Sequence, residues 1–139
     1  MSTEENKAKV RRVYEESINT GNMAVVDELY SPEHKLYTSS DTIHGPEGFK
    51  QFVMMYRTAF PDLHFIIDDL VAEGDKVVSR YTAHGTHRGS LQGIAPTGKQ
   101  VTVTGIAINR IVNGKVVESW LNFDALGMLQ QLGVIPRMG

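Results

Sequence analysis

The sequence contains no cysteine, and its other scarce features also exclude whole classes of protein. Without cysteine there is no disulfide, no thiolate metal ligand and no cysteine nucleophile. Neither sign of charge dominates, because 14 basic and 16 acidic residues give a formal net charge of −2. We therefore expect no nucleic-acid partner, which would need a basic surface. No apolar run approaches the roughly 18 residues of a membrane-spanning helix, and the N-terminus MSTEENKAKV is polar. We expect a soluble, cytoplasmic protein with no membrane contact.

The length and the order of the patterns define the fold class. A chain of 139 residues buries about two thirds of its unfolded surface without disulfides, so we expect a single domain over residues 1–139. Apolar residues recur at helical spacing in the first half and at alternate positions from residue 64 onward. Helices followed by strands in one small domain indicate an α+β fold. We expect a cone-shaped, curved, mostly antiparallel sheet with three N-terminal helices packed over its concave face.

Three helices are expected before the strands. The first carries an apolar stripe over residues 10–18 and ends at Asn19-Thr20-Gly21, where glycine can take the left-handed conformation that ends helices. The second covers residues 23–30 and stops before Ser31-Pro32. The third opens at Gly45-Pro46-Glu47, because proline suits the first helical position, and it ends at Pro61.

Four strands and a fourth helix follow. The alternating segments are residues 64–72, 76–86, 101–112 and 115–124, and consecutive strands joined by short links should pair antiparallel. The weaker pattern of residues 34–43 is interpreted as a short strand and a loop. Residues 125–132 are interpreted as a short helix ended by Gly133 and Pro136.

The turn Asn113-Gly114 sets the register of the last two strands, because a two-residue Asn-Gly loop is a strong hairpin signal. Counting out from it predicts polar or aromatic residues of one strand facing small residues of the other, which leaves space for a cavity on that side of the sheet. The predicted pairs are Asn109 with Glu118, Ala107 with Trp120, Gly105 with Asn122, and Val103 with Asp124.

The opposite side of the same hairpin is predicted to be apolar throughout. It carries Ile106, Ile108, Val117, Leu121 and Phe123. Since the helices are already assigned to the cavity side, too few elements remain to cover this face. We therefore expect a two-fold symmetric homodimer through Ile106, Ile108, Leu121 and Phe123.

Short motifs in a fixed order resemble those of a known family. The resemblance covers about residues 6 to 135 and is to the SnoaL-like polyketide cyclase, or ester cyclase, family, within the nuclear-transport-factor-two-like superfamily of cystatin-like α+β rolls. The matching motifs are His44-Gly45-Pro46-Glu47-Gly48, Ala59-Phe60-Pro61-Asp62, Val78-Ser79-Arg80-Tyr81-Thr82, Gly85-Thr86-His87-Arg88-Gly89, Gly93-Ile94-Ala95-Pro96-Thr97-Gly98, Glu118-Ser119-Trp120 through Asp124, and Gln131-Leu132-Gly133.

The resemblance implies an enzyme that closes a ring by aldol condensation of a polyketide methyl ester, without a metal or organic cofactor. It places the acid/base role on Asp124. Arg80, His84 and His87 are the groups expected to face the enolate, and Asp124, His87 and Arg80 form the predicted catalytic set. A small apolar molecule is the expected partner, and the predicted substrate contacts are Trp120, Asn122, His84, Tyr14, Tyr56, Phe52 and Glu118.

Each of these residues also has a purely structural interpretation. Asp124 immediately precedes a helix, where aspartate is a favoured N-cap. Arg80 can pair with Glu118 and fix strand register. His84 and His87 can be surface or hydrogen-bonded wall residues, and the tyrosines and phenylalanines can be core or the walls of a pocket.

Two further functions stay open from the sequence. Epoxide hydrolases of the same fold use an Asp-Arg-Asp set, of which Asp124 and Arg80 supply only part. The same cone also serves as a non-catalytic ligand-binding or dimerisation module. A ketosteroid isomerase is disfavoured, because Thr38 or Ser39 stands where those enzymes carry a base aspartate.

Overall fold

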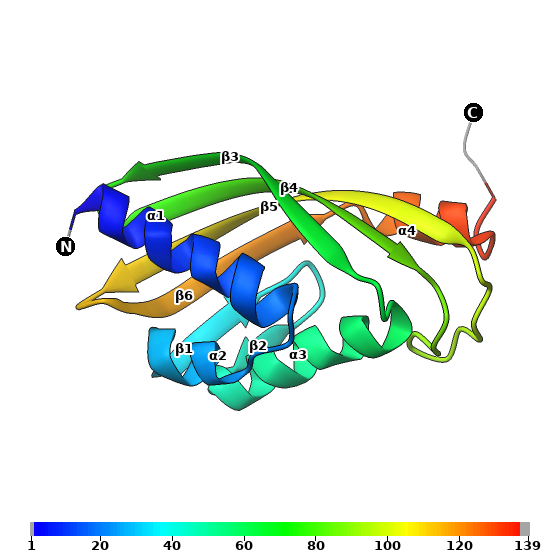
Figure 1. Ribbon diagram of the computed structural model, residues 1–139, viewed down its shortest axis with the longest axis horizontal. Helices are drawn as coiled ribbons and strands as arrows, with labels where there is room; N and C mark the ends of the chain where they lie inside the picture. The colour runs from blue at the N-terminus through cyan, green and yellow to red at the C-terminus, as the bar shows by residue number, and fades with distance from the viewer. Residues whose placement is uncertain (1, 137–139) are drawn as a thin grey trace.

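The structure, a computed structural model, describes residues 2–136 (Figure 1). It contains the expected helices and the four expected strands of the second half, but two strands, the first beginning at Tyr30, stand where a short strand and a loop were expected over residues 34–43. Helix α1 (Thr3–Arg12) continues into a π-helical segment, η1 (Val13–Ile18), and is followed by α2 (Ala24–Leu29), α3 (Gly45–Ala59) and α4 (Ala125–Leu132). The strands are β1 (Tyr30–Tyr37), β2 (Thr42–His44), β3 (His64–Glu73), β4 (Lys76–Thr86), β5 (Gln100–Val112) and β6 (Lys115–Phe123).

The six strands form one sheet in the order β2-β1-β6-β5-β4-β3. The four strands β3 to β6 pair antiparallel in sequence order, as predicted. Strand β1 pairs parallel with β6, which the sequence analysis did not anticipate. Figure 1 shows α1, α2 and α3 on one side of the curved sheet, with α1 lying along β3 and β4 and α3 along β1. The α+β class and the cone with helices on its concave side are confirmed.

Local chemistry explains where the helices begin and end. Ser2 and Glu5 form a capping box that starts α1, since each side chain accepts a hydrogen bond from the other residue's backbone N–H. Gly45 has a φ of 73° and precedes a proline in the first turn of α3. Gly133 ends α4 with a φ of 80°.

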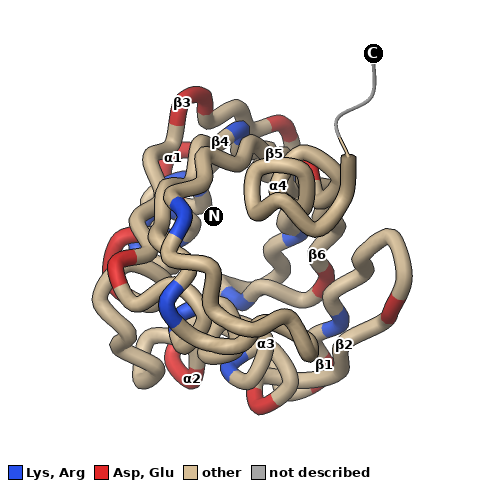
Figure 2. The backbone as a smooth tube through the Cα atoms, turned by 90° about the vertical axis from the view of Figure 1, so that its right-hand side faces the viewer, with Lys and Arg blue, Asp and Glu red and all other residues tan. Residues whose placement is uncertain are grey.

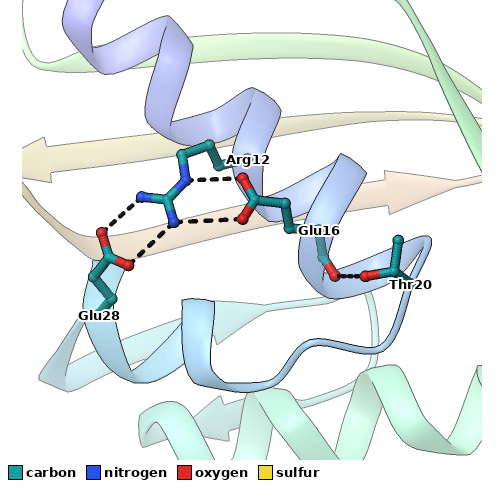
Figure 3. A network of polar contacts seen from close by, with 4 residues as sticks. All are labelled: Arg12, Glu16, Thr20 and Glu28. Atoms are coloured by element: carbon teal, nitrogen blue, oxygen red, sulfur yellow. Dashed lines mark hydrogen bonds and ion pairs between the residues drawn. The ribbon is translucent and has the colours of Figure 1, made fainter.

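A salt-bridge network ties the N-terminal helices together (Figure 3). The Arg12 guanidinium binds the Glu16 carboxylate at 2.9 Å and the Glu28 carboxylate at 2.6 Å. Thr20, at the end of η1, donates to the backbone carbonyl of Glu16. The Arg12–Glu28 pair therefore joins α1 to α2, while the contacts of Glu16 lie within α1, η1 and the turn that follows. Figure 2, seen along the long axis, shows acidic and basic positions interspersed around the chain.

A β-bulge in β6 changes the predicted register of the hairpin. The turn itself is as expected, because Asn113 and Gly114 both have positive φ, of 51° and 77°. Ile111 pairs with Val116, but Arg110 then pairs with Glu118, so Val117 is an extra residue on β6. Beyond the bulge every β6 side chain lies on the face opposite to the one predicted.

The two faces of the sheet can therefore be assigned. The inner face, towards the helices, carries Val103, Gly105, Ala107 and Asn109 of β5 with Ser119, Leu121 and Phe123 of β6. The outer face carries Ile106 and Ile108 with Glu118, Trp120 and Asn122. The small residues of β5 were placed correctly by the sequence. The β6 residues were placed on the wrong face, because a single inserted residue reverses the alternation.

Candidate active site

The inner face of the sheet, η1 and α3 enclose an apolar cavity. It consists of two adjoining hollows of about 70 Å³ and 90 Å³. One hollow extends towards α4 and the ends of β4 and β5, and the other reaches towards η1, β1 and the middle of the sheet. Six side chains line both hollows and mark where they meet: Phe52, Tyr56, Leu63, Phe65, Tyr81 and Leu121.

Four of the predicted substrate contacts line this cavity. Tyr14 lies on the 90 Å³ hollow, His84 on the 70 Å³ hollow, and Phe52 and Tyr56 on both. Tyr14 belongs to the π-helical segment, and π-helical turns are frequent at functional sites. Its hydroxyl lies 2.7 Å from Oγ of Ser79 on β4. His84 is exposed, and its Nδ1 lies 3.2 Å from Oγ1 of Thr102.

Three other predicted contacts lie on the outer face instead. Glu118 binds Arg110 at 2.8 Å, Trp120 stacks on Tyr37 with ring centroids 5.8 Å apart, and Asn122 is exposed. The bulge at Val117 is the cause, since without it these side chains would point inward. The prediction that they line the cavity was wrong.

Arg80 also lies outside the cavity, on the outer face of β4. Its guanidinium binds the Asp69 carboxylate at 2.6 Å and approaches Asp68 at 3.9 Å. The predicted pairing with Glu118 is absent among residues 2–136, where Glu118 pairs with Arg110. Arg80 and Asp124 are not brought together, so the Asp-Arg part of an epoxide-hydrolase-like set does not form.

Asp124 follows Phe123 at the end of β6 and caps α4. Its Oδ1 accepts a hydrogen bond of 2.9 Å from the backbone N–H of Gly127, and the side chain is exposed. This confirms the structural interpretation of Asp124 as an N-cap. The residues on either side of it in space, Phe123 and Met128, line the cavity, so Asp124 stands beside the cavity rather than inside it.

His87 is fully buried and has a structural environment. Its Nδ1 accepts a 3.2 Å hydrogen bond from the backbone N–H of Thr97, and its ring lies 5.5 Å from the Phe60 ring. It is not among the residues that line the two hollows. His87 is therefore hydrogen-bonded, as one interpretation of the sequence expected, but it is buried away from the two hollows and is neither a surface residue nor part of their walls.

Polar groups that were not predicted as site residues lie at the inner end of the cavity. Asn109 and Ser119 face each other across β5 and β6 and line the 90 Å³ hollow. His34, behind them on β1, has its Nε2 2.9 Å from the Ser119 Oγ. Burial lowers the pKa of His34 to about 4, so its ring is neutral at physiological pH. These residues come from three strands whose pairing depends on the bulge and on the parallel contact of β1 with β6.

Several tyrosines add hydroxyl groups to the cavity wall. Burial raises the pKa of Tyr14 to about 12 and also raises the pKa values of Tyr30, Tyr56 and Tyr81. All four therefore keep their protons at neutral pH and can donate hydrogen bonds. Tyr81 has room for its ring only because Gly105 lies opposite, where a Cβ atom would stand 2.3 Å from the Tyr81 hydroxyl.

The described residues contain neither a cluster of metal-binding side chains nor a membrane-spanning helix. Within residues 2–136 no group of three or more histidine, aspartate and glutamate side chains is arranged to hold a metal ion. No helix in that range is long and apolar enough to cross a membrane.

Comparisons with known proteins agree with this geometry. The family profile for SnoaL-like polyketide cyclase matches residues 8–132. Nogalonic acid methyl ester cyclase of Streptomyces nogalater is 32% identical over 122 residues, covering 84% of this chain and 90% of that protein. Aklanonic acid methyl ester cyclase DnrD of Streptomyces peucetius is 30% identical over 128 residues, covering 89% and 88%.

Among solved structures, AclR from Streptomyces galilaeus, a proposed hydroxylase, superposes with a TM-score of 0.88. It is 28% identical, and the match covers 99% of this chain and 87% of AclR. Fold, profile and relatives agree over nearly the whole chain, and the chain belongs to the SnoaL-like polyketide cyclase family.

Proposed function

We propose that the protein closes a ring in a polyketide-like ester by intramolecular aldol addition inside the inner-face cavity. The observation that carries this proposal is the cavity itself, which has apolar walls and a polar inner end formed by Asn109 and Ser119. The relatives named as methyl ester cyclases support the same substrate class. An apolar cavity with a few polar groups suits a ring-forming chain that bears several carbonyl oxygens.

The reaction divides into steps that the cavity can support. A base removes a proton from the carbon next to one carbonyl, the resulting enolate carbon attacks a second carbonyl carbon, and the new alkoxide takes up a proton. Atoms and electrons balance without an oxidant, so product and substrate are isomers. Apolar walls hold the chain folded with its reacting carbons close together. Protonated tyrosine hydroxyls such as those of Tyr14, Tyr56 and Tyr81 can stabilise the enolate oxygen.

The acid/base role of Asp124 is part of this proposal. Its position between Phe123 and Met128 puts a carboxylate beside the apolar cavity, within one residue of a lining side chain. The test is the rate of ring closure by the Asp124→Asn variant, since asparagine keeps the N-cap but cannot accept the proton. Asp41→Asn, in the exposed loop before β2, is the matched control.

A second candidate function is non-catalytic binding of an apolar ligand. The observation that favours it is the Asp124 carboxylate, which is exposed and already hydrogen-bonded to the backbone of α4. A binding protein would gain thermal stability from the ester but would not convert it. Wild-type protein incubated with a polyketide methyl ester therefore separates the two functions, because only the cyclase produces an isomer of the ester.

We also propose a homodimer through the outer face, at a place different from the predicted one. Ile106 and Ile108 lie on this face, but Leu121 and Phe123 line the cavity and take no part. One register row crosses five strands with an apolar or aromatic residue at every position: Val71, Val78, Ile108, Trp120 and Tyr37.

This row, which we call the outer apolar row, has charged neighbours on one side. The next row contains Glu73, Lys76, Arg110, Glu118 and Lys35, in which both signs of charge occur. Val71 is 60% exposed and Ile106 48% exposed, so a second copy related by a two-fold axis would remove apolar surface from water. Because both signs of charge occur in this second row, positive groups of one copy can face negative groups of the other across the two-fold axis.

A further inference from the structure

A chain of three polar side chains connects a buried histidine to the inner end of the cavity. His34 is 1% exposed, Ser119 4% and Asn109 8%. The His34 Nε2 lies 2.9 Å from the Ser119 Oγ, which in turn lies 2.5 Å from the Asn109 Oδ1. The three residues come from β1, β6 and β5, three adjacent strands of the sheet. None of them was predicted as a site residue.

The direction of the hydrogen bonds follows from His34. A neutral imidazole has one N–H, and the His34 Nδ1 is buried with no partner among residues 2–136. A proton on Nδ1 would leave an N–H both buried and unpaired, which costs free energy that a proton on Nε2 avoids. The Nε2–H therefore donates to the Ser119 Oγ, and the Ser119 hydroxyl donates to the Asn109 Oδ1.

This direction leaves the Asn109 amide nitrogen as the free end of the chain. Its two N–H groups have no acceptor among residues 2–136, while the side chain lines the 90 Å³ hollow. Hydrogen bonds in series polarise one another, so donation by His34 and Ser119 makes the Asn109 N–H groups better donors. A polarised donor that faces an apolar cavity is suited to an acceptor atom of a ligand, which would take the place of water there.

We propose that the Asn109 amide binds a carbonyl oxygen of the ligand at the inner end of the cavity, with Ser119 and His34 as positioning residues. This inference rests on the proposed function, which supplies the identity of the ligand. It adds that a carbonyl group of that ligand enters the cavity first. If that carbonyl is the one that enolises, charge grows on its oxygen and the hydrogen bond strengthens as the proton is lost.

The test uses two small probes of the same shape that differ in one oxygen. Acetylnaphthalene carries a ketone, and ethylnaphthalene is the matched hydrocarbon. Their dissociation constants are measured by calorimetry for the wild type, for Asn109→Leu and for Ser119→Ala. The control variant is Gln51→Leu, which makes a comparable amide-to-leucine change on the exposed side of α3. The infrared carbonyl band of bound acetylnaphthalene reports the hydrogen bond directly, because a donor lowers its frequency.

We expect Asn109→Leu to weaken acetylnaphthalene binding about tenfold, to leave ethylnaphthalene binding unchanged or tighter, and to raise the frequency of the carbonyl band. Ser119→Ala should weaken acetylnaphthalene binding and raise the band frequency by smaller amounts. If Asn109→Leu does not fold, the Ser119→Ala variant provides the test by itself. Gln51→Leu should behave as the wild type.

The inference is overturned if both probes bind but neither the affinity for acetylnaphthalene nor its carbonyl band responds to Asn109→Leu and Ser119→Ala. In that case the cavity still binds ligands and the proposed function stands. If neither probe binds the wild type, the cavity is not a ligand site, and both the inference and the proposed function fail.

Discussion

Asn109 lies opposite Ser119 across β5 and β6, one residue away from the partner, Glu118, that the Asn113-Gly114 turn predicts. The extra residue responsible is Val117. It turns Ser119 and Leu121 into the cavity and leaves Glu118 outside with Arg110. The composition of the candidate site thus depends on one inserted residue.

Deletion of Val117 should leave the inner face of β6 unchanged. It removes the unpaired residue itself, so Val116, Glu118 and Ser119 would alternate regularly, and Glu118 would keep Arg110 as its partner outside the cavity. We expect the deletion variant to stay folded by circular dichroism, as Val117→Ala does. An unfolded deletion variant beside a folded Val117→Ala would contradict the assigned register.

Gly105 should be essential because Tyr81 occupies the space in front of it. A Cβ atom at position 105 would stand 2.3 Å from the Tyr81 hydroxyl and 2.4 Å from the ring carbon that bears it. We expect Gly105→Ala to destabilise the protein by about 1–3 kcal/mol in urea unfolding. Tyr81→Leu in the same chain should recover part of that loss, since leucine is shorter. Additive effects of the two substitutions would argue against the contact.

Acid should destabilise the protein through His34. The folded-state pKa of His34 is about 4, below the ordinary value of 6.5, because burial disfavours the charged ring and the nearby Glu118 carboxylate only partly opposes this. The unfolded chain therefore binds more protons between these two values. The stability that neutral His34 contributes is complete above pH 6.5 and is lost as the pH falls towards 4. The loss is at most about 3 kcal/mol.

Urea unfolding between pH 7 and about pH 4.5 measures this contribution. Carboxylates begin to titrate at the acid end of this range, so the contribution of His34 is the difference between the wild type and a matched variant. The matched variant is His34→Gln, which keeps a hydrogen-bonding side chain and cannot titrate. We expect the wild type to lose more stability on acidification than this variant, and identical pH profiles would rule out a buried neutral His34.

Much of the fold could be predicted from the sequence because local signals determine it. The Asn-Gly turn, the Gly45-Pro46 helix start and the Gly133 helix end each depend on backbone preferences of one or two residues, and all three are present. Counting from the same turn also placed Ala107 and Asn109 of β5 correctly on the inner face, whereas Arg80 of β4, expected to face the cavity, lies on the outer face.

The β6 half of the site could not be predicted for a physical reason. Val116 and Val117 are equally suited to a strand, so nothing local marks which of them is unpaired. The parallel pairing of β1 with β6 joins residues such as Leu36 and Ser119, which are distant in the sequence, and it brings His34 against Ser119. The helix cap was the alternative to the predicted acid/base role of Asp124, and this cap is present, since it depends only on the residues that follow.

The outer apolar row predicts a homodimer, and a single charged side chain introduced into this row should prevent the homodimer from forming. Ile108 lies at the centre of the row, between Val78 and Trp120. We expect wild-type protein to sediment at twice its chain mass of 15.4 kDa and Ile108→Lys to sediment as a monomer, since lysine there would be buried without a partner. Met54→Lys, an exposed apolar position on α3, is the control. A monomeric wild type would refute the proposed interface.

The most direct test of the central claim, that ring closure takes place in the inner-face cavity, is the rate of conversion of a polyketide methyl ester by two matched variants. Ala83→Leu adds volume to a residue that lines the 70 Å³ hollow, and Thr104→Leu adds a similar side chain on the exposed outer face. The rate is followed by chromatographic appearance of the isomeric product.

We predict that Ala83→Leu lowers kcat/KM by at least about tenfold, while Thr104→Leu retains the wild-type value. Both variants should keep a folded circular dichroism spectrum. Equal rates for Ala83→Leu and wild type, or no conversion by the wild type, would contradict the account.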